Sequence, residues 1–384
     1  MPSSSSRFAW IDNLRTTVIV LVVNMHACVT YSHVGGWYVT EQPEPSLSEK
    51  IPFIFWQGHL QAFFMGLLFF LAGVFALRSL ERHGAAKFLR ERWLRLGLPA
   101  LLYMVLIHPF IVYVLLGAPR IPNRPPLGTL YADYVTSVRV LRGNGPLWFA
   151  LALLAFCLAL VAWRTASRQL RPTPDRKSSA PSPTSLLVFG CVLVVTTFAI
   201  RLVQPIGTDV LNFQLCFFPQ YVAAFIAGVA AGRDGWLQEL ATARRARVAG
   251  WLGLIGGPML LAGVIALGGP PPERGSNPYA GGWQGQAFGL AMWEQLAGLG
   301  LGLGMLALFR ARLNRDHAIA RWLSERAFGV YVLHAPILVA LTPLLRPLHA
   351  NAFVNVALLT ALGLIASYAA ADLARRIPGL RAIL

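Results

Sequence analysis

Charged residues are scarce in this sequence, and the scarcity defines its class. Only 13% of the 384 residues are Asp, Glu, Lys or Arg, whereas 56% are hydrophobic. A soluble domain carries about 25% charged residues, so the composition excludes a soluble globular chain. Apolar stretches of about 20 residues are long enough to cross a bilayer as helices. We therefore expect an all-α polytopic membrane protein.

The sequence also lacks the short motifs of several enzyme classes. Its four cysteines all lie in apolar runs, and none has the Cys/His spacing of a metal site or disulfide framework. No Walker motif, dinucleotide-binding glycine motif or nucleophile elbow is present. No internal repeat is visible, which argues against transporter folds built from repeated halves. We expect neither a metal nor a tightly bound cofactor.

Acidic residues are half as frequent as basic ones, 16 against 33, and the net charge is +17. The basic residues fall in short loops between apolar spans, which argues against a nucleic-acid partner. If the N-terminus lies inside, 25 of the 33 fall in inside segments and 8 elsewhere. The positive-inside rule then predicts that both termini are cytoplasmic. The ten predicted spans are approximately 12–33, 53–77, 98–117, 146–163, 184–203, 212–232, 248–268, 286–309, 327–345 and 352–373.

We expect residues 1–384 to form one membrane domain, with a flexible, basic and Ser/Pro-rich cytoplasmic loop at 164–183. The first span follows MPSSSSR without a small-residue cleavage site, so we expect it to be retained. Tryptophans near span ends, Trp37 among them, are expected to anchor the chain at the membrane interface. The spacing of Gly66 and Gly73 predicts close helix packing on the second span.

The first predicted span carries ionisable side chains that a lipid-facing helix avoids. Because a helix turns about 100° and rises about 1.5 Å per residue, Arg15 and His26 lie within about 20° of one face and about 16 Å apart. Asp12 lies about 40° from this line, and His33 about 20°. Such groups usually face a bundle interior or a wet cavity. The alternative for Asp12 and Arg15 is an ion pair in the headgroup region.

His26 is the best candidate for a catalytic base, because histidine titrates near neutrality. Glu294 and Asp12 are candidates for orienting its imidazole. Depth favours Glu294, since Asp12 is some 20 Å away along the helix. His33 and His59 lie at a similar depth to His26 and are candidates for the acceptor side. For His59, interfacial hydrogen bonding is an equal alternative.

Arg92 and Arg95 are spaced i,i+3 and would face the same way on a helix. Paired guanidinium groups suit a phosphate or pyrophosphate, because each planar fork binds two oxygens. Together with Arg15 they are the predicted donor-binding residues, and an ordinary basic inner loop is the alternative. His334, about two turns into the ninth span from the cytoplasm, is either a packing histidine or part of this donor site.

These motifs resemble those of the acyltransferase-3 family of integral-membrane O-acyltransferases. The resemblance covers roughly residues 7–345 and follows the family's order. It rests on WIDNLRTTVIVLVVNMH, FFMGLLFFLAG, RERWLRLGLP, GPLWFALAL and FGVYVLHAPIL. The WID start, the loop beginning SHVGGWYV and His59 look most like the branch that modifies periplasmic glucans, such as the glucan succinyltransferases.

The family's first-helix Arg and His match Arg15 and His26, and its RxxR pair matches Arg92 and Arg95. The resemblance implies a stand-alone enzyme of a bacterial inner membrane. It would move an acetyl- or succinyl-type group from a cytoplasmic acyl-CoA donor to a hydroxyl of an extracytoplasmic glycan or related acceptor. Its expected partners are acyl-CoA, the carbohydrate and the bilayer, and homo-oligomer formation stays open. A proton-coupled transporter with a buried His/Glu relay and a membrane scaffold or lipid-handling protein are the alternatives.

Overall fold

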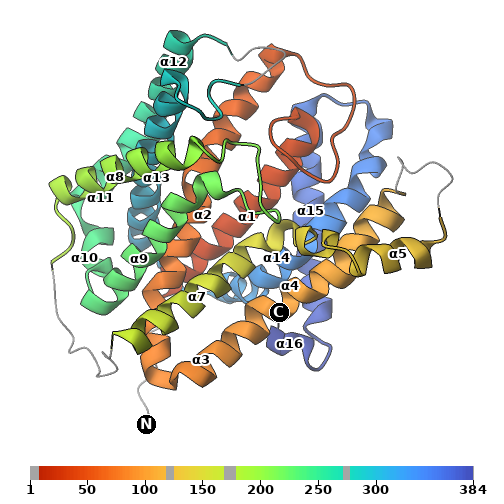
Figure 1. Cartoon of the computed structure of the whole chain (residues 1–384), viewed down its shortest axis with the longest axis horizontal. Helices are drawn as coiled ribbons and strands as arrows, with labels where there is room; N and C mark the ends of the chain where they lie inside the picture. Colours follow the sequence, from red (N-terminus) through yellow and green to blue (C-terminus); the bar gives the residue numbers. More distant parts are fainter. Residues whose placement is uncertain (1–7, 118–124, 168–178, 271–276, 384) are drawn as a thin grey trace.

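The computed structural model of the chain describes residues 8–117, 125–167, 179–270 and 277–383. About 80% of the chain is helical, and these residues contain no strand. Ten helices in the described ranges are long and apolar enough to cross a membrane (Figure 1). The predicted fold class is therefore confirmed, and the protein is a polytopic helical membrane protein. Whether residues 1–384 act as one domain stays a prediction.

The bounds of the ten spans, with their component helices, are as follows. They are α1 (Ala9–Ser32), α2 (Leu47–His83), Ala85–Leu115 (α3 Ala85–Arg92, η1 Trp93–Gly97, α4 Leu98–Leu102, η2 Tyr103–Ile107, η3 Phe110–Leu115), Gly145–Ala166 (η4 Gly145–Leu147, α7 Trp148–Ala166), α8 (Pro183–Arg201), Leu215–Asp234 (η5 Leu215–Phe217, α9 Phe218–Asp234), Arg244–Gly268 (α11 Arg244–Trp251, η6 Leu252–Gly256, α12 Gly257–Gly268), α13 (Gly285–Arg312), Ala318–Leu348 (α14 Ala318–Leu345, η7 Arg346–Leu348) and α15 (Ala352–Ala374). Short helices outside the spans are α5 (Leu127–Val135), α6 (Arg139–Arg142), α10 (Leu237–Thr242) and α16 (Leu380–Ile383).

The helix α1 lies inside the bundle, in contact with α2, α13, α14 and α15. About 61% of its most apolar window is buried, against 22% for α8 and 17% for the span α11–α12. Helices that are apolar all round are stable either inside a protein or in lipid. The ionisable residues of α1 therefore occupy the interior, while α8, α11 and α12 form the rim of the bundle.

The helices α2 and α9 approach each other closely through glycines. A Cβ atom added at Gly73 would lie 2.3 Å from the Phe225 carbonyl oxygen, and one added at Gly228 would lie 2.1 Å from the Phe70 carbonyl oxygen. Such small residues let membrane helices pack backbone against backbone. The close packing predicted from the Gly66–Gly73 spacing is confirmed at Gly73.

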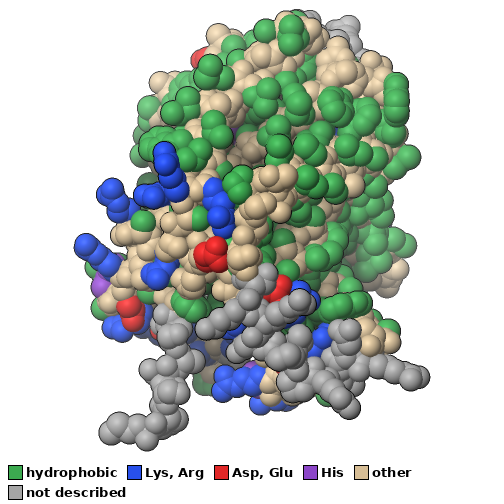
Figure 2. All heavy atoms as spheres, turned by 90° about the vertical axis from the view of Figure 1, so that its left-hand side faces the viewer, with side chains coloured by type: hydrophobic (Ala, Val, Ile, Leu, Met, Phe, Trp, Pro, Cys, Tyr) green, Lys and Arg blue, Asp and Glu red, His purple; other side chains and the backbone are tan. Residues whose placement is uncertain are grey.

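Both described ends of the chain lie at one end of the bundle, because ten crossings return it to the side where it started. α3 and α16 lie there, at the bottom of Figure 1. We call it the basic end, because Arg92, Arg164 and Arg326 belong to helix ends on this side. Figure 2 shows Lys and Arg side chains toward the bottom and lower left, with hydrophobic side chains above them. This distribution agrees with an inside basic end, although the orientation stays a prediction.

Two helix limits differ from the prediction in ways that matter for the site. α1 ends at Ser32, and His33 has a left-handed φ of 58°. The predicted polar stripe therefore stops before His33. α14 begins at Ala318, nine residues before the predicted limit, so His334 lies in the second half of its helix rather than near the basic end. Of the loop predicted at 164–183, residues 168–178 lie outside the described ranges.

Candidate active site

Two histidines from distant parts of the chain meet inside the bundle. Nδ1 of His26 on α1 lies 3.0 Å from Nε2 of His334 on α14. The two rings are stacked, with centroids 5.0 Å apart and an angle of 14° between their planes. His334 is fully buried, whereas His26 is partly accessible. The sequence predicts a carboxylate partner for His26, and for His334 either packing or a place in the donor site. The structure pairs the two histidines with each other.

The hydrogen bonds assign a protonation state to this histidine pair. Nδ1 of His334 lies 2.8 Å from the carbonyl oxygen of Tyr331. A carbonyl can only accept, so Nδ1 of His334 carries a proton and its Nε2, in the neutral ring, carries a lone pair. That lone pair accepts from Nδ1–H of His26. Nε2 of His26 is then left with a lone pair, which is the arrangement of a general base.

A loop aromatic residue completes the base's surroundings. Trp37 stacks on His26 with ring centroids 3.6 Å apart and an interplanar angle of 13°. Its indole N–H is buried and has no hydrogen-bond partner among the described residues. Trp37, predicted as an interfacial anchor, instead lies against the ring of His26 and holds its plane.

The loop that carries Trp37 is fastened to the helices at both sides of the stack. Nε2 of His33 lies 2.7 Å from the carbonyl oxygen of Glu41, and the Glu41 amide donates to the Thr30 carbonyl at 2.8 Å. The carboxylate of Glu41 accepts two bonds from Arg346, at 2.7 and 2.9 Å. His33 therefore holds the loop against α1, and its acceptor-side role stays a prediction.

A cluster of phenols and a third histidine lies beside the stack. The hydroxyl of Tyr38 lies 3.1 Å from the Tyr103 hydroxyl and 2.9 Å from Nδ1 of His108. Burial raises the pKa of Tyr38 to about 12, so it stays protonated at neutral pH. Gly145, with a φ of 48°, touches this cluster; a Cβ there would lie 2.6 Å from the Tyr38 hydroxyl. Only glycine adopts this positive φ readily and also leaves room for the Tyr38 hydroxyl.

The GPLW motif also contacts the histidine pair's helix, because the Tyr331 hydroxyl donates to the carbonyl of Pro146. Tyr331 thus uses its side chain to bind η4 and its carbonyl to hold His334. Tyr38, His108 and Tyr331 were missed by the sequence analysis. The available signals were the Gly145–Pro146 dipeptide beside a span and the YVLH run around His334.

Arg15 and Asp12 lie toward the basic end of α1, separated from the histidine pair. Nη1 of Arg15 is 3.9 Å from Oδ1 of Asp12, and the Arg15 guanidinium lies over the ring of Phe75 at 5.0 Å. Because α1 is one continuous helix, the predicted separation of about 16 Å between Arg15 and His26 holds. Asp12 lies farther still and does not orient the imidazole.

The predicted alignment of Arg92 and Arg95 is wrong. Arg92 ends α3, half-buried and over the ring of Phe88 at 5.0 Å, whereas Arg95 lies in the π-helical segment η1 and is exposed. A π turn bonds residue i to i+5, so the i,i+3 alignment of an α-helix is lost there. Arg15 and Arg92 both lie toward the basic end, and their binding of a donor stays a prediction.

Glu294 does not orient His26. Its carboxylate accepts from Nη2 of Arg201 at 2.6 Å and from the Gln295 amide at 2.8 Å. Arg201 is completely buried and Glu294 is 4% exposed. An unpaired carboxylate in the membrane is costly, and Arg201 satisfies it. The sequence analysis counted Arg201 only as a residue of the outer segments, although an arginine ending an apolar span was a sign of such pairing.

His59 lies against Trp293, which forms a separate apolar cluster with Leu261 and Ala297. Its Nδ1 lies 2.6 Å from the carbonyl oxygen of Phe55, and its ring meets Trp293 edge-on at 5.1 Å. The structure does not bring His59 to the histidine pair. In the described ranges no group of three or more His, Cys, Asp or Glu is arranged to hold a metal ion.

Comparison with known proteins agrees with the site. A family model described as an acyltransferase domain matches residues 8–372, nearly the whole chain. No curated protein and no solved structure matches the chain significantly. The matched range includes the histidine pair on α1 and α14 and the arginines at the basic end. The chain belongs to the acyltransferase-3 family, and it is a membrane acyltransferase that transfers groups other than amino-acyl groups.

Proposed function

We propose that this acyltransferase moves an acetyl- or succinyl-type group from acyl-CoA, bound at the basic end, to a hydroxyl of a carbohydrate that reaches the opposite end. In this proposal the basic end is cytoplasmic and the membrane is a bacterial inner membrane. The observation that carries the proposal is the chain of hydrogen bonds from the Tyr331 carbonyl through His334 to His26. It leaves a neutral imidazole nitrogen as a base inside a membrane protein.

In the proposed reaction, Nε2 of His26 removes the proton of the acceptor hydroxyl as its oxygen attacks the thioester carbonyl. The carbon–oxygen bond forms, the carbon–sulfur bond breaks, and the CoA thiolate takes the proton back from His26. His334 positions His26 through Nδ1 and stabilises the imidazolium that forms during the attack. Because the acceptor attacks directly, no covalent acyl-enzyme is needed.

The separation between the arginines and the base supports a long donor. Arg15 and Arg92 lie at the basic end, and His26 lies about 16 Å from Arg15 along α1. A nucleotide whose phosphates bind the guanidinium groups can extend its thioester arm up α1 to the base. Compounds that carry phosphate close to the acyl group would not match this separation.

The opposite side of the base supports a polar acceptor. Trp37 and the loop 33–46 reach His26 from that side, and the unpaired indole N–H of Trp37 is a donor for a sugar hydroxyl or for the developing oxyanion. The proton-relay transporter is less well supported, because Glu294 is bound to Arg201 rather than to a histidine.

The test is single-turnover transfer by the purified protein at saturating acetyl-CoA or succinyl-CoA, with a glucan oligosaccharide as acceptor and product detection by mass spectrometry. We expect acyl ester formation by the wild type and by His59→Ala, the matched control for a half-buried histidine outside the pair. We expect His26→Ala to bind acyl-CoA without transferring it. Proton-coupled solute uptake without consumption of acyl-CoA would overturn the proposal.

A further inference from the structure

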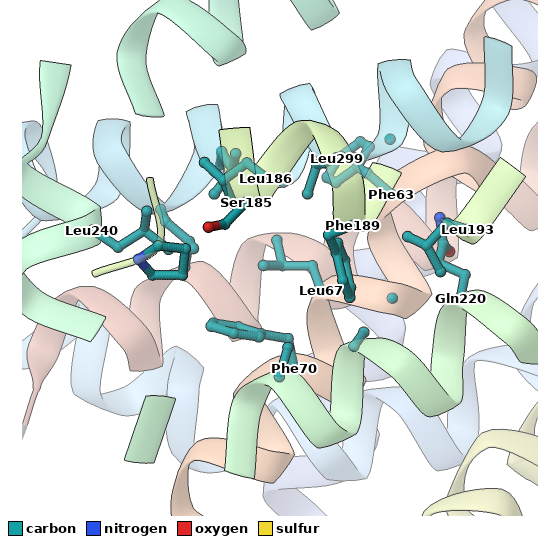
Figure 3. A pocket seen from close by; sticks show the side chains of 18 of the residues that line it. Phe63, Leu67, Phe70, Ser185, Leu186, Phe189, Leu193, Gln220, Leu240 and Leu299 are labelled. Atoms are coloured by element: carbon teal, nitrogen blue, oxygen red, sulfur yellow. The ribbon is translucent and has the colours of Figure 1, made fainter. Parts of the chain in front are cut away.

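A half-open cavity of about 250 Å³ lies on the other side of the bundle, lined by residues of α2, α8, α9, α10 and α13. It is elongated. Ser185 and Leu240 mark one end in Figure 3, and Gln220 and Leu193 mark the other. Along α13 it extends from Gly298 to Leu306, about 12 Å. Its long axis therefore follows the helices and runs from the basic end toward the middle of the membrane.

The lining of this cavity is apolar along its length. Phenylalanine and leucine side chains form the walls, and the polar side chains Ser185 and Gln220 stand at opposite ends. Interiors are normally packed without voids of this size, and an engineered apolar cavity of about 150 Å³ stays dry and binds benzene. A larger apolar cavity gains dispersion contacts when hydrocarbon fills it.

Its surroundings identify the source of that hydrocarbon. The helix that covers the cavity, α8, is the least buried of the enclosing spans, and its outer face exposes Leu187, Val188 and Val192. The cavity therefore lies at the apolar rim of the bundle. Ser185, at the basic end, is exposed. The nearby helix α11 exposes Arg244 and Arg247, and basic residues at a membrane surface attract lipid phosphate.

We propose that this cavity binds one hydrocarbon chain of a phospholipid, which enters from the basic end and places its terminal methyl near Gln220. The side-chain amide of Gln220 donates to the backbone carbonyl of Ala62 at 2.7 Å and to the side-chain oxygen Oε1 of Gln295 at 3.2 Å. The amide N–H groups of Gln220 therefore keep their acceptors when an apolar chain end lies beside them. Through Gln295 the chain end also contacts the network that holds Glu294 and Arg201. The proposal does not depend on the transfer reaction.

One glycine lets the cavity be closed without disturbing the helices. Gly302 on α13 lines the cavity, and a Cβ atom added there would meet nothing within 4 Å. Gly302→Leu therefore fills the space from within. Gly263→Leu on α12 is the matched control, because Gly263 also has open space around its Cβ position and does not line the cavity.

The probe is a phospholipid with a photoreactive diazirine in its acyl chain, incorporated with the purified full chain into lipid nanodiscs. Labelled residues are mapped by mass spectrometry. We expect labelling of Phe189 in the wild type and in Gly263→Leu, and about tenfold less in Gly302→Leu, because the filled cavity excludes the chain. Val188, on the lipid-facing side of α8, should be labelled equally in all three.

Two results would overturn the proposal. One is equal labelling of Phe189 in Gly302→Leu and wild type, and the other is no labelling of Phe189 in either. A competition experiment gives a further result that would overturn the proposal. If palmitoyl-CoA displaces the label and an excess of unlabelled phospholipid does not, the cavity binds an acyl donor instead.

Discussion

The His26–His334 and Arg201–Glu294 pairs inside this bundle are satisfied in opposite ways. His26 and His334 are joined by one bond of 3.0 Å between neutral rings, and the chain of donors ends on a free nitrogen. Arg201 and Glu294 form an ion pair of 2.6 Å, and the second carboxylate oxygen accepts from Gln295. The first pair has an unused lone pair on Nε2 of His26. The second has a fully paired carboxylate.

This difference suits the histidine pair to catalysis and the ion pair to stabilising the fold. A base must hold a lone pair that can accept a proton, and the neutral histidine pair has one on Nε2 of His26. A buried ion pair is costly to form and more costly to break, because removing one partner strands the other charge. We therefore expect substitutions at the histidine pair to lower the rate, and substitutions at the ion pair to lower stability.

The largest effect is expected at His26. His26→Ala removes the proposed base, and a positioned base contributes about 10²–10⁴-fold to the rate. The variant should lose transfer by at least that range while its binding of acyl-CoA and its thermal stability stay near those of the wild type. Single-turnover transfer at saturating donor measures the loss. A wild-type rate for His26→Ala would remove the histidine pair from the reaction.

Glu294→Gln should lower the stability of the fold rather than the rate of transfer. It leaves the Arg201 charge buried without its partner, which costs about 3–5 kcal/mol. We expect a lower unfolding temperature in detergent and less protein in the membrane, while the folded fraction keeps the wild-type rate per molecule. A stable Glu294→Gln protein with a reduced single-turnover rate would contradict the supporting role and return Glu294 to the chemistry.

His334 tests whether positioning alone matters. His334→Leu removes the acceptor for Nδ1–H of His26, and a displaced catalytic group can cost about 10²-fold. His334→Gln keeps a side-chain acceptor and should recover part of that loss. The measurement is the rate at saturating donor together with the apparent donor affinity, which should not change. A change in affinity alone would restore the donor-binding role predicted from sequence.

The smallest effects are expected among the arginines at the basic end. Arg92→Ala should weaken donor binding by about 1.5–3 kcal/mol, the value of one charge-assisted hydrogen bond. Arg92→Lys should rescue it poorly, because a point charge lacks the planar fork. Arg95→Ala is the control and should have little effect, since Arg95 is exposed on the π turn. The measurement is a titration of acyl-CoA binding to each variant. Equal losses of affinity in the two alanine variants would show that both arginines bind the donor.

Several features of the fold and site could be read from the chain itself. Apolar stretches of the right length predicted the ten spans, because each stretch is a local property of consecutive residues. The separation of Arg15 and His26 followed from helical geometry and held, because α1 is unbroken between them. The same reasoning failed for Arg95, where the chain forms a π turn that the residue spacing did not reveal.

What the sequence by itself determined is therefore local: the membrane class, the number of spans, and a histidine at a known height on α1. The partners of the ionisable groups were decided only by tertiary structure. His26 and His334 are 308 residues apart, and Arg201 and Glu294 are 93 apart. A helical pattern shows which face a side chain occupies but not which helix lies opposite. Tertiary packing placed a histidine opposite His26 and an arginine opposite Glu294, and so separated the proposed base from the supporting ion pair.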